Sequence, residues 1–335
     1  MRGIACTFAR YNPLHKGESP GPPITLRPAT PETDFAQLAA WFTLIEDEPS
    51  TENGLIEYYQ KAKERILAQV AVDAAGELLG FYWAARDRQV FDRTTFFLFT
   101  RPESRRQGVG GQLYEHMLQA IQAKALHVRV WDNDPESLGY AGRRGFSERS
   151  HQVAMALDLD AFDDRPYDAI ISRLQGEGFT FTSMEGLGDT EEAQRKLYAL
   201  NDSTDRETMG ASGEPNWESF EDFQKSVCRS EWYKPAGQKV VLEPASGEFV
   251  AMSAITRFEG VDYAYNLHTG VDKRYRNRQL GRAVKITALR FARQALDVHQ
   301  VRTHHNSKNL PMLAIDHHLG YVLLPGTFLM EKILA

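Results

Sequence analysis

A glycine-rich turn is the first segment of this sequence whose residues could do chemistry. A predicted strand ends near Thr100, and a predicted helix opens near Gly108 with apolar residues at helical spacing. Glycine allows close backbone approach, and the N–H groups and dipole of a helix start favour a phosphate, to which neighbouring arginines add positive charge. The residues expected at this phosphate site are Thr100, Arg105, Arg106, Gln107, Gly108, Val109, Gly110 and Gly111.

A second segment, 271–281, carries a related pattern. Gln279 stands there in the place of the first glycine, and a register shifted by two residues, 278–283, fits Arg-x-x-Gly-x-Ala literally. Neither turn has the third glycine of a dinucleotide-binding fold or the Gly-Lys-Ser/Thr of a P-loop. The residues expected at the second phosphate site are Val271, Arg276, Asn277, Arg278, Gln279, Leu280, Gly281 and Arg282.

The two turns belong to an internal repeat. Arg105 and Arg276 are 171 residues apart, and the same offset relates the rest of the two turns. Farther on, Gly145 and Gly320 are 175 residues apart, which places about four extra residues in the second copy. Because a fixed offset over a long segment is the signature of duplication, we predict two copies of one fold.

The elements around each turn predict an α+β (mixed α/β) fold, because hairpins alternate with helices. In the first copy we expect a strand at 25–30 and helices at 32–45 and 52–68. An acidic linker is expected at 158–164 and a long loop at 205–218. The predicted organisation is an N-terminal arm at 1–23, a first domain at 24–160 and a second domain at 161–335.

The motifs resemble the GNAT superfamily of N-acetyltransferases, whose acyl-CoA-binding motif is Arg/Gln-x-x-Gly-x-Gly/Ala after a strand. The resemblance implies two tandem GNAT-like acyl-CoA N-acyltransferase domains, each a splayed mixed sheet flanked by helices, similar in architecture to mycothiol synthase. It implies acetyl-CoA as cofactor and a bulge near 99–100 in the strand before the first turn. It also implies CoA contacts at Asn306 and Asn309, of which the second has the family's spacing before Gly320.

The resemblance also implies positions for an acid and a base, but neither copy has the usual residues there. The family's tyrosine acid is replaced by Ala141 in the first copy and by Asp316 in the second. The family's acidic base is replaced by Thr94 and Tyr265. Because the central strand of the second copy is the more polar one, we expect catalysis there, with Tyr265, His268 and Asp316 as candidate catalytic residues.

Packing competes with function at several positions. Tyr140, beside the acid position of the first copy, is better explained by packing, and His268 could also be a packed histidine. Trp217 fits a substrate pocket or a core equally well. The pairs 304–305 and 317–318 are poor zinc chelates, because adjacent side chains diverge on a strand and on a helix alike.

The composition excludes other classes of protein. The net charge of −6 over 335 residues argues against a broadly basic nucleic-acid-binding protein, and two cysteines exclude a disulfide scaffold. No apolar run reaches the roughly 18 residues of a membrane helix, and the first residues lack a secretory signal. We therefore expect a cytoplasmic protein with neither a membrane nor a nucleic-acid partner, in an oligomeric state that the sequence leaves open.

These observations favour an acetyl-CoA-dependent N-acetyltransferase that moves an acyl group directly from CoA to an amine of a small molecule. Two alternatives stay open. One is a catalytically weak, acyl-CoA-binding regulatory protein, which the missing tyrosine and acidic base favour. The other is a protein N-acetyltransferase.

Overall fold

The computed structural model describes residues 24–46, 50–88, 90–208 and 217–334, which form two compact units. The first unit comprises Met1–Gln152 and Pro325–Ala335, and the second comprises Val153–Leu324. This boundary lies before the predicted one at 160, because a single strand runs across it. The arm predicted at 1–23 lies outside the described residues. No helix of the described residues is long and apolar enough to span a membrane.

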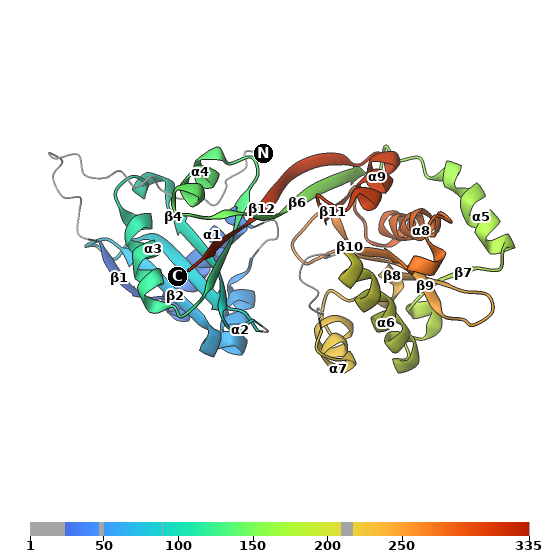
Figure 1. Cartoon of the computed structure of the whole chain (residues 1–335), viewed down its shortest axis with the longest axis horizontal. Helices are drawn as coiled ribbons and strands as arrows, with labels where there is room; N and C mark the ends of the chain where they lie inside the picture. The colour runs from blue at the N-terminus through green and yellow to red at the C-terminus, as the bar shows by residue number, and fades with distance from the viewer. Residues whose placement is uncertain (1–23, 47–49, 89, 209–216, 335) are drawn as a thin grey trace. The chain divides into compact units, whose positions relative to one another are not determined.

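The first unit is a mixed sheet with the strand order β1-β2-β3-β4-β5-β12. Figure 1 labels β1, β2, β4 and β12 of this sheet. The helix predicted at 52–68 is too long: it ends at Ala62, and residues from Ile66 pair with the next strand. The elements of this unit are β1 Thr25–Pro28, α1 Pro31–Ile45, α2 Glu52–Ala62, β2 Ile66–Val72, β3 Leu78–Arg86, β4 Arg93–Thr100, α3 Val109–Ala120, β5 Ala125–Trp131 and α4 Pro135–Arg143. Two strands, β6 Ser147–Asp158 and β12 Val322–Ile333, are divided between the units.

The second unit has the strand order β11-β10-β9-β8-β7. The loop predicted at 205–218 begins too early, because α6 continues to Thr208; residues 209–216 lie outside the described residues. The elements of this unit are α5 Asp168–Gly176, β7 Thr180–Ser183, α6 Glu191–Thr208, α7 Phe220–Phe223, β8 Gln238–Leu242, β9 Phe249–Thr256, β10 Ala264–Val271, α8 Leu280–Ala295, β11 Gln300–Asn306 and α9 Leu310–Leu319.

The structure confirms the repeat element by element. Strands β3 and β4 and helix α3 correspond to β9, β10 and α8 at the first offset. Elements β5, α4 and β6 correspond to β11, α9 and β12 at the second offset. Helix α3 has 12 residues and α8 has 16, so the four extra residues of the second copy form about one more helical turn.

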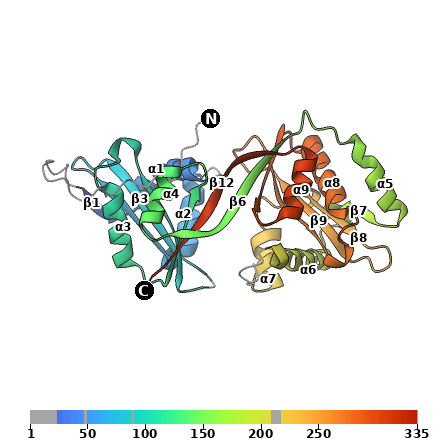
Figure 2. The ribbon, with the colours of Figure 1, turned by 45° about the horizontal axis from the view of Figure 1, so that its top comes forward.

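Each sheet is covered on both faces. In the first unit α1 packs on one face, with Phe35 and Leu38, and α3 packs on the other, with Leu113 and Met117. In the second unit α6 and α7 cover one face, and α5 and α8 cover the other (Figure 2). Burial of these apolar side chains is the main stabilising contribution to each unit.

The first unit contains two separate stretches of the chain. Residues Thr327–Ile333 of β12 pair antiparallel with Ala125–Trp131 of β5. Met330 of this strand is buried in the core of the first unit, and Phe328 packs against the same core. The final strand is therefore an integral part of the first unit's sheet.

The acidic segment predicted as a linker makes specific contacts within the second unit. Asp164 forms ion pairs with Arg290 and Arg293 of α8, the second of them at 2.7 Å. Burial raises the pKa of Asp164, but the two arginines lower it more, so it lies below its usual value. Residues 158–164 are thus held against α8.

Candidate functional site

The site in the second unit begins where two parallel strands separate. Strands β10 and β11 are joined by two residue pairs, of which the last is Tyr265 with Arg302. Both strands run on from there, β10 to Val271 and β11 to Asn306, without further pairing between them. The separation leaves backbone groups of β10 available to a ligand.

A bulge accompanies this separation, but it lies in the second copy. The pairing of β10 with β9 shifts register between Asn266 and His268. The bulge expected near 99–100 in the first copy is absent, because the described β3–β4 pairing is unbroken from Thr94 to Thr100. An extra residue in a strand reverses the face on which the following side chains lie, so the bulge alters which side chains of β10 face the opening.

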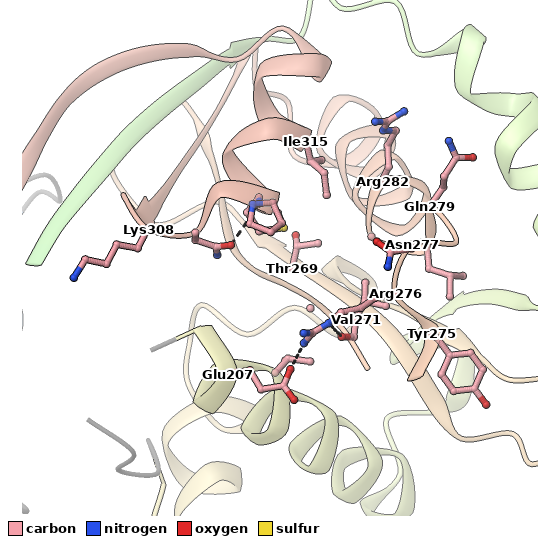
Figure 3. Close-up of a pocket in the computed structure, with 17 residues that line it drawn as sticks. Glu207, Thr269, Val271, Tyr275, Arg276, Asn277, Gln279, Arg282, Lys308 and Ile315 are labelled. Atoms are coloured by element: carbon pink, nitrogen blue, oxygen red, sulfur yellow. Dashed lines mark hydrogen bonds and ion pairs between the residues drawn. The ribbon is translucent and has the colours of Figure 1, made fainter. Parts of the chain in front are cut away.

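A cavity of about 710 Å³ lies at this opening. Its wall comes from β10, the turn before α8, the start of α9 and the end of α6. Figure 3 shows Arg276 reaching Glu207 on one side of the cavity, with Ile315 entering from α9 on the opposite side. The lining residues are Thr204, Glu207, Thr269, Gly270, Val271, Tyr275, Arg276, Asn277, Gln279, Leu280, Gly281, Arg282, Lys308, Asn309, Pro311, Met312 and Ile315.

The turn before α8 has the same backbone shape as the turn before α3. Arg106 and Asn277 both have φ of 64°, while Gly108 and Gln279 have φ of 86° and 68°. These pairs follow the 171-residue offset, so Gln279 takes the place of the first glycine and the shifted register is wrong. In both turns an arginine donates from Nε to the last strand carbonyl, from Arg276 to Val271 at 3.2 Å in the second copy.

Gln279 and Gly108 occupy matching left-handed positions in the two turns, so replacing each by the residue of the other turn tests the cost of a side chain there. Replacing Gln279 by glycine is expected to stabilise the second unit by about 1 kcal/mol, because a left-handed backbone strains any residue with a Cβ. The bond lost, from Arg173 Nη2 to Gln279 Oε1, is exposed and 3.3 Å long. Denaturant unfolding measures the change. Gly108→Gln in the first unit is the matched control and should have the opposite sign; destabilisation by both variants would contradict this account.

The arginines beside the cavity differ in their partners. Arg276 pairs with Glu207, and Arg278 pairs with Glu177 at 2.6 Å. The Nε of Arg282 is buried and makes no hydrogen bond within the described residues. This orphaned donor and the N–H groups at the start of α8 suit a phosphate-bearing ligand. The carboxylate of Glu207 would repel the phosphates of such a ligand, so the phosphates are expected on the side of the cavity away from Glu207.

The three candidate catalytic residues have different surroundings. Tyr265 is buried and its hydroxyl bonds to His304, away from the lining of the cavity. The Nε2 of His268 lies 2.9 Å from Oγ1 of Thr204, which does line the cavity. Burial, and to a lesser degree the charge of His305, lower the pKa of His268 to about 4, so its ring is neutral at pH 7.

Asp316 is fully buried and does not line the cavity. One carboxylate oxygen pairs with Lys285, and the other lies 2.6 Å from Nε2 of His305. Burial raises the pKa of Asp316, but the Lys285 charge and the His305 hydrogen bond outweigh it and lower the pKa. The carboxylate is thus ionised, and both of its oxygens are engaged.

Most of the residues expected to bind the cofactor in the second copy line one cavity, but Arg278 and Asn306 do not. Asn309 caps α9, and Asn306 accepts a hydrogen bond from the Lys308 backbone. Sequence reasoning missed the wall formed by α6, with Thr204 and Glu207. Glu207 lay in a predicted loop, and no motif marks either residue.

In the first copy the expected residues surround a turn of the same shape, and Thr100, Val109 and Gly110 are buried there. Tyr140 is a core residue, with the Arg144 guanidinium 3.7 Å from its ring. Trp217 packs on Phe223 and is not part of the cavity lining. Among the described residues no group of three or more His, Cys, Asp or Glu side chains could hold a metal ion.

Comparison with solved structures shows the fold. A glucosamine N-acetyltransferase region of a fungal multi-domain GH3 β-N-acetylglucosaminidase aligns with 93% of this chain at 16% identity and a TM-score of 0.71, although the chain spans only 38% of that protein. A tandem GNAT protein from the clavulanic acid biosynthesis pathway covers 93% of this chain and 98% of its own, at 17% identity and a TM-score of 0.68. A GCN5-related N-acetyltransferase from Sphaerobacter thermophilus covers 92% and 95%, at 15% identity and a TM-score of 0.65.

Comparison at the level of sequence identifies a smaller part of the chain. No curated protein matches the chain. Residues 35–146 match the model of the acetyltransferase (GNAT) family, a range that contains the first glycine-rich turn and the strand and helix on either side of it. Residues 35–146 are therefore a domain of the GNAT acetyltransferase family, and the chain as a whole has the fold of tandem GNAT proteins.

Proposed function

We propose that the protein transfers an acetyl group from acetyl-CoA to an amine of a small molecule, and that the second unit carries out this transfer. The observation that carries the proposal is the cavity where β10 and β11 separate, whose wall includes the turn before α8 and the start of α9. A CoA thioester needs such an opening, because its pantetheine arm must run beside a strand while its phosphates meet a helix start.

The residues around the cavity fit the parts of CoA. The turn from Asn277 to Gly281 and the orphaned Nε of Arg282 suit the pyrophosphate. Lys308 and Asn309 at the start of α9 add a positive charge and an amide. CoA supplies the acetyl group as a thioester, and the chain's contribution is to align that group with the amine and exclude water.

The α6 side of the cavity is suited to the amine. Glu207 lines the cavity, and Asp205 lies on the same helix beside the lining residue Thr204. Burial, together with the charge of Asp202, raises the pKa of Asp205 to about 6. Glu207 is already paired with Arg276, so Asp205 is the carboxyl group of this helix that would attract a protonated amine.

A ligand-binding experiment tests the proposal. Saturating CoA is expected to raise the melting temperature of the protein, because a ligand that binds only the folded state stabilises it by about 2.7 kcal/mol at 100 times its dissociation constant. A panel of primary amines assayed for release of free CoA thiol should then identify an acceptor. Absence of any melting shift would refute acetyl-CoA binding. A shift without turnover on small amines or peptides would support a regulatory acyl-CoA-binding protein instead.

A further inference from the structure

A buried polar network joins three elements of the second unit. Lys285 of α8 and Asp316 of α9 form an ion pair in which both side chains are fully inaccessible to solvent. His305 of β11 bonds to the remaining oxygen of Asp316 at 2.6 Å. Apolar residues of similar volume are often at least as stabilising as a buried ion pair, because the desolvation of two charges offsets their attraction. Stability alone therefore gives a weak reason for this network.

His305 lies where β11 has separated from β10. One residue beyond the last backbone pair, Thr303 Oγ1 donates a hydrogen bond of 3.0 Å to the Asn266 carbonyl, and His305 is the next residue of β11 on the same face as Thr303. Its side chain is 11% exposed, whereas Asp316 is fully buried. The charge of His305 also affects the pKa of His268, which bonds to a residue of the cavity wall. His305 does not line the cavity, but it is the one member of the Lys285–Asp316–His305 network whose side chain is exposed to solvent at all.

We propose that His305 transfers the proton during acetyl transfer in the second unit, and that Asp316, fixed by Lys285, is the residue that positions its ring. The inference rests on the function proposed above. The family resemblance implies an acid at position 316, but both oxygens of Asp316 are engaged and none of its atoms lines the cavity. An acid or base at this place would therefore have to be His305, the partner of Asp316 that keeps a free ring nitrogen and some exposure to solvent.

The hydrogen bond to Asp316 defines which nitrogen of His305 can act. A carboxylate only accepts hydrogen bonds, so Nε2 carries a hydrogen and Nδ1 keeps a lone pair in the neutral ring. When Nδ1 takes up a proton, the Asp316 carboxylate stabilises the resulting imidazolium. A histidine held by an aspartate acts in the same way in other acyl transfers.

The proposed step is balanced in atoms and electrons. The nitrogen of the free amine forms a bond to the acyl carbon, and the carbon–sulfur bond breaks with its electron pair on sulfur. Nδ1 of His305 accepts one proton from the nitrogen and delivers it to the sulfur, so the products are an amide and a free thiol. Because nitrogen and sulfur are attached to the same carbon during transfer, one ring can serve both.

Ring-nitrogen NMR tests the contact without any amine. In protein labelled with ¹⁵N at histidine, addition of CoA should shift Nδ1 of His305, while desulfo-CoA, which has no thiol, should not. The resonance is assigned with His305→Gln. If CoA binds but leaves Nδ1 unaffected, the role of His305 is overturned while the proposed function stands. If CoA does not bind, both proposals fail.

Kinetics test the role with the acceptor that the amine panel identifies. His305→Gln should lower kcat about 10²- to 10³-fold and leave the affinity for CoA within a few-fold, because it removes proton transfer only. Asp316→Asn should lower kcat to a similar extent and remove the CoA-dependent shift of Nδ1. His317→Gln, at an exposed position next to Asp316 on the same helix, is the matched control and should behave as wild type.

The variants differ in their risk of misfolding. Asp316→Asn leaves Lys285 buried without its counter-ion, whereas His305→Gln leaves the ion pair intact. Should Asp316→Asn fail to fold, His305→Gln alone decides the question. Full activity in a folded His305→Gln variant would overturn the proposal, and so would a change confined to KM for CoA.

Discussion

Tryptophan in place of Gly281 is expected to abolish CoA binding and acetyl transfer by the second unit. A single methyl group at this position would already lie 3.1 Å from Cγ2 of Val271 and 3.8 Å from Cδ1 of Ile315. Both neighbours line the cavity, so an indole ring can fit only by occupying the space of the ligand. We expect at least a 100-fold loss of CoA affinity, which corresponds to about 2.7 kcal/mol.

Titration calorimetry with CoA measures this effect, and two variants control it. Gly176→Trp is in the same unit, at an exposed glycine where an added Cβ would meet no other part of the protein within 4 Å, and this variant should bind CoA normally. Gly110→Trp changes the matching glycine of the first unit and should leave most of the turnover. If Gly110→Trp abolished turnover and Gly281→Trp did not, catalysis would belong to the first unit.

Removal of residues 325–335 is expected to unfold the first unit while the second unit remains folded. Truncation deletes the seven residues of β12 that pair with β5 and removes Met330 and Phe328 from the core. Loss of one buried side chain of this size typically destabilises a protein by about 2–5 kcal/mol, a large part of the 5–15 kcal/mol that holds most domains folded. The second unit ends at Leu324, so the truncated chain keeps all of its residues.

Hydrogen exchange measures the effect separately in each unit. Amides of β3, β4 and β5 should lose protection in the truncated chain, whereas those of β9 and α8 should keep it. A synthetic peptide of residues 325–335, added in excess, should restore part of the protection. Unchanged protection in β5 would show that β12 is dispensable to the first unit.

Local patterns predicted much of this fold and site. The shape of the two turns, the matching elements and the extra residues of the second copy followed from glycines at fixed spacing, because φ above zero is a requirement that a single residue meets. Gln279 shows the limit of that argument. The backbone keeps its left-handed shape there without a glycine, which the repeat offset indicated and the literal motif did not.

Features that depend on distant partners could not be predicted. The pairing of β12 with β5 joins segments far apart in the sequence, and nothing in either strand specifies the other. The network of Lys285, His305 and Asp316 likewise joins residues of three elements. The sequence drew attention to Asp316 by its motif position and to His305 as one of two adjacent histidines, and nothing drew attention to Lys285. Asp316 was expected as a candidate catalytic residue because of its motif position, and that position gave no sign of its two buried partners.

Because β12 is the last strand of the chain but belongs to the sheet of the first unit, that sheet cannot be completed until synthesis is almost finished. Ribosomes add about 5–20 residues per second, so Thr327 follows its partner Trp131 after on the order of ten to forty seconds. During that interval β5 has an unpaired edge, which is a template for association with other nascent chains. The second unit can complete its sheet before the first, although it is made later. A chaperone that covers exposed strand edges should therefore bind nascent chains that end between β5 and β12, and release them once residue 333 has emerged.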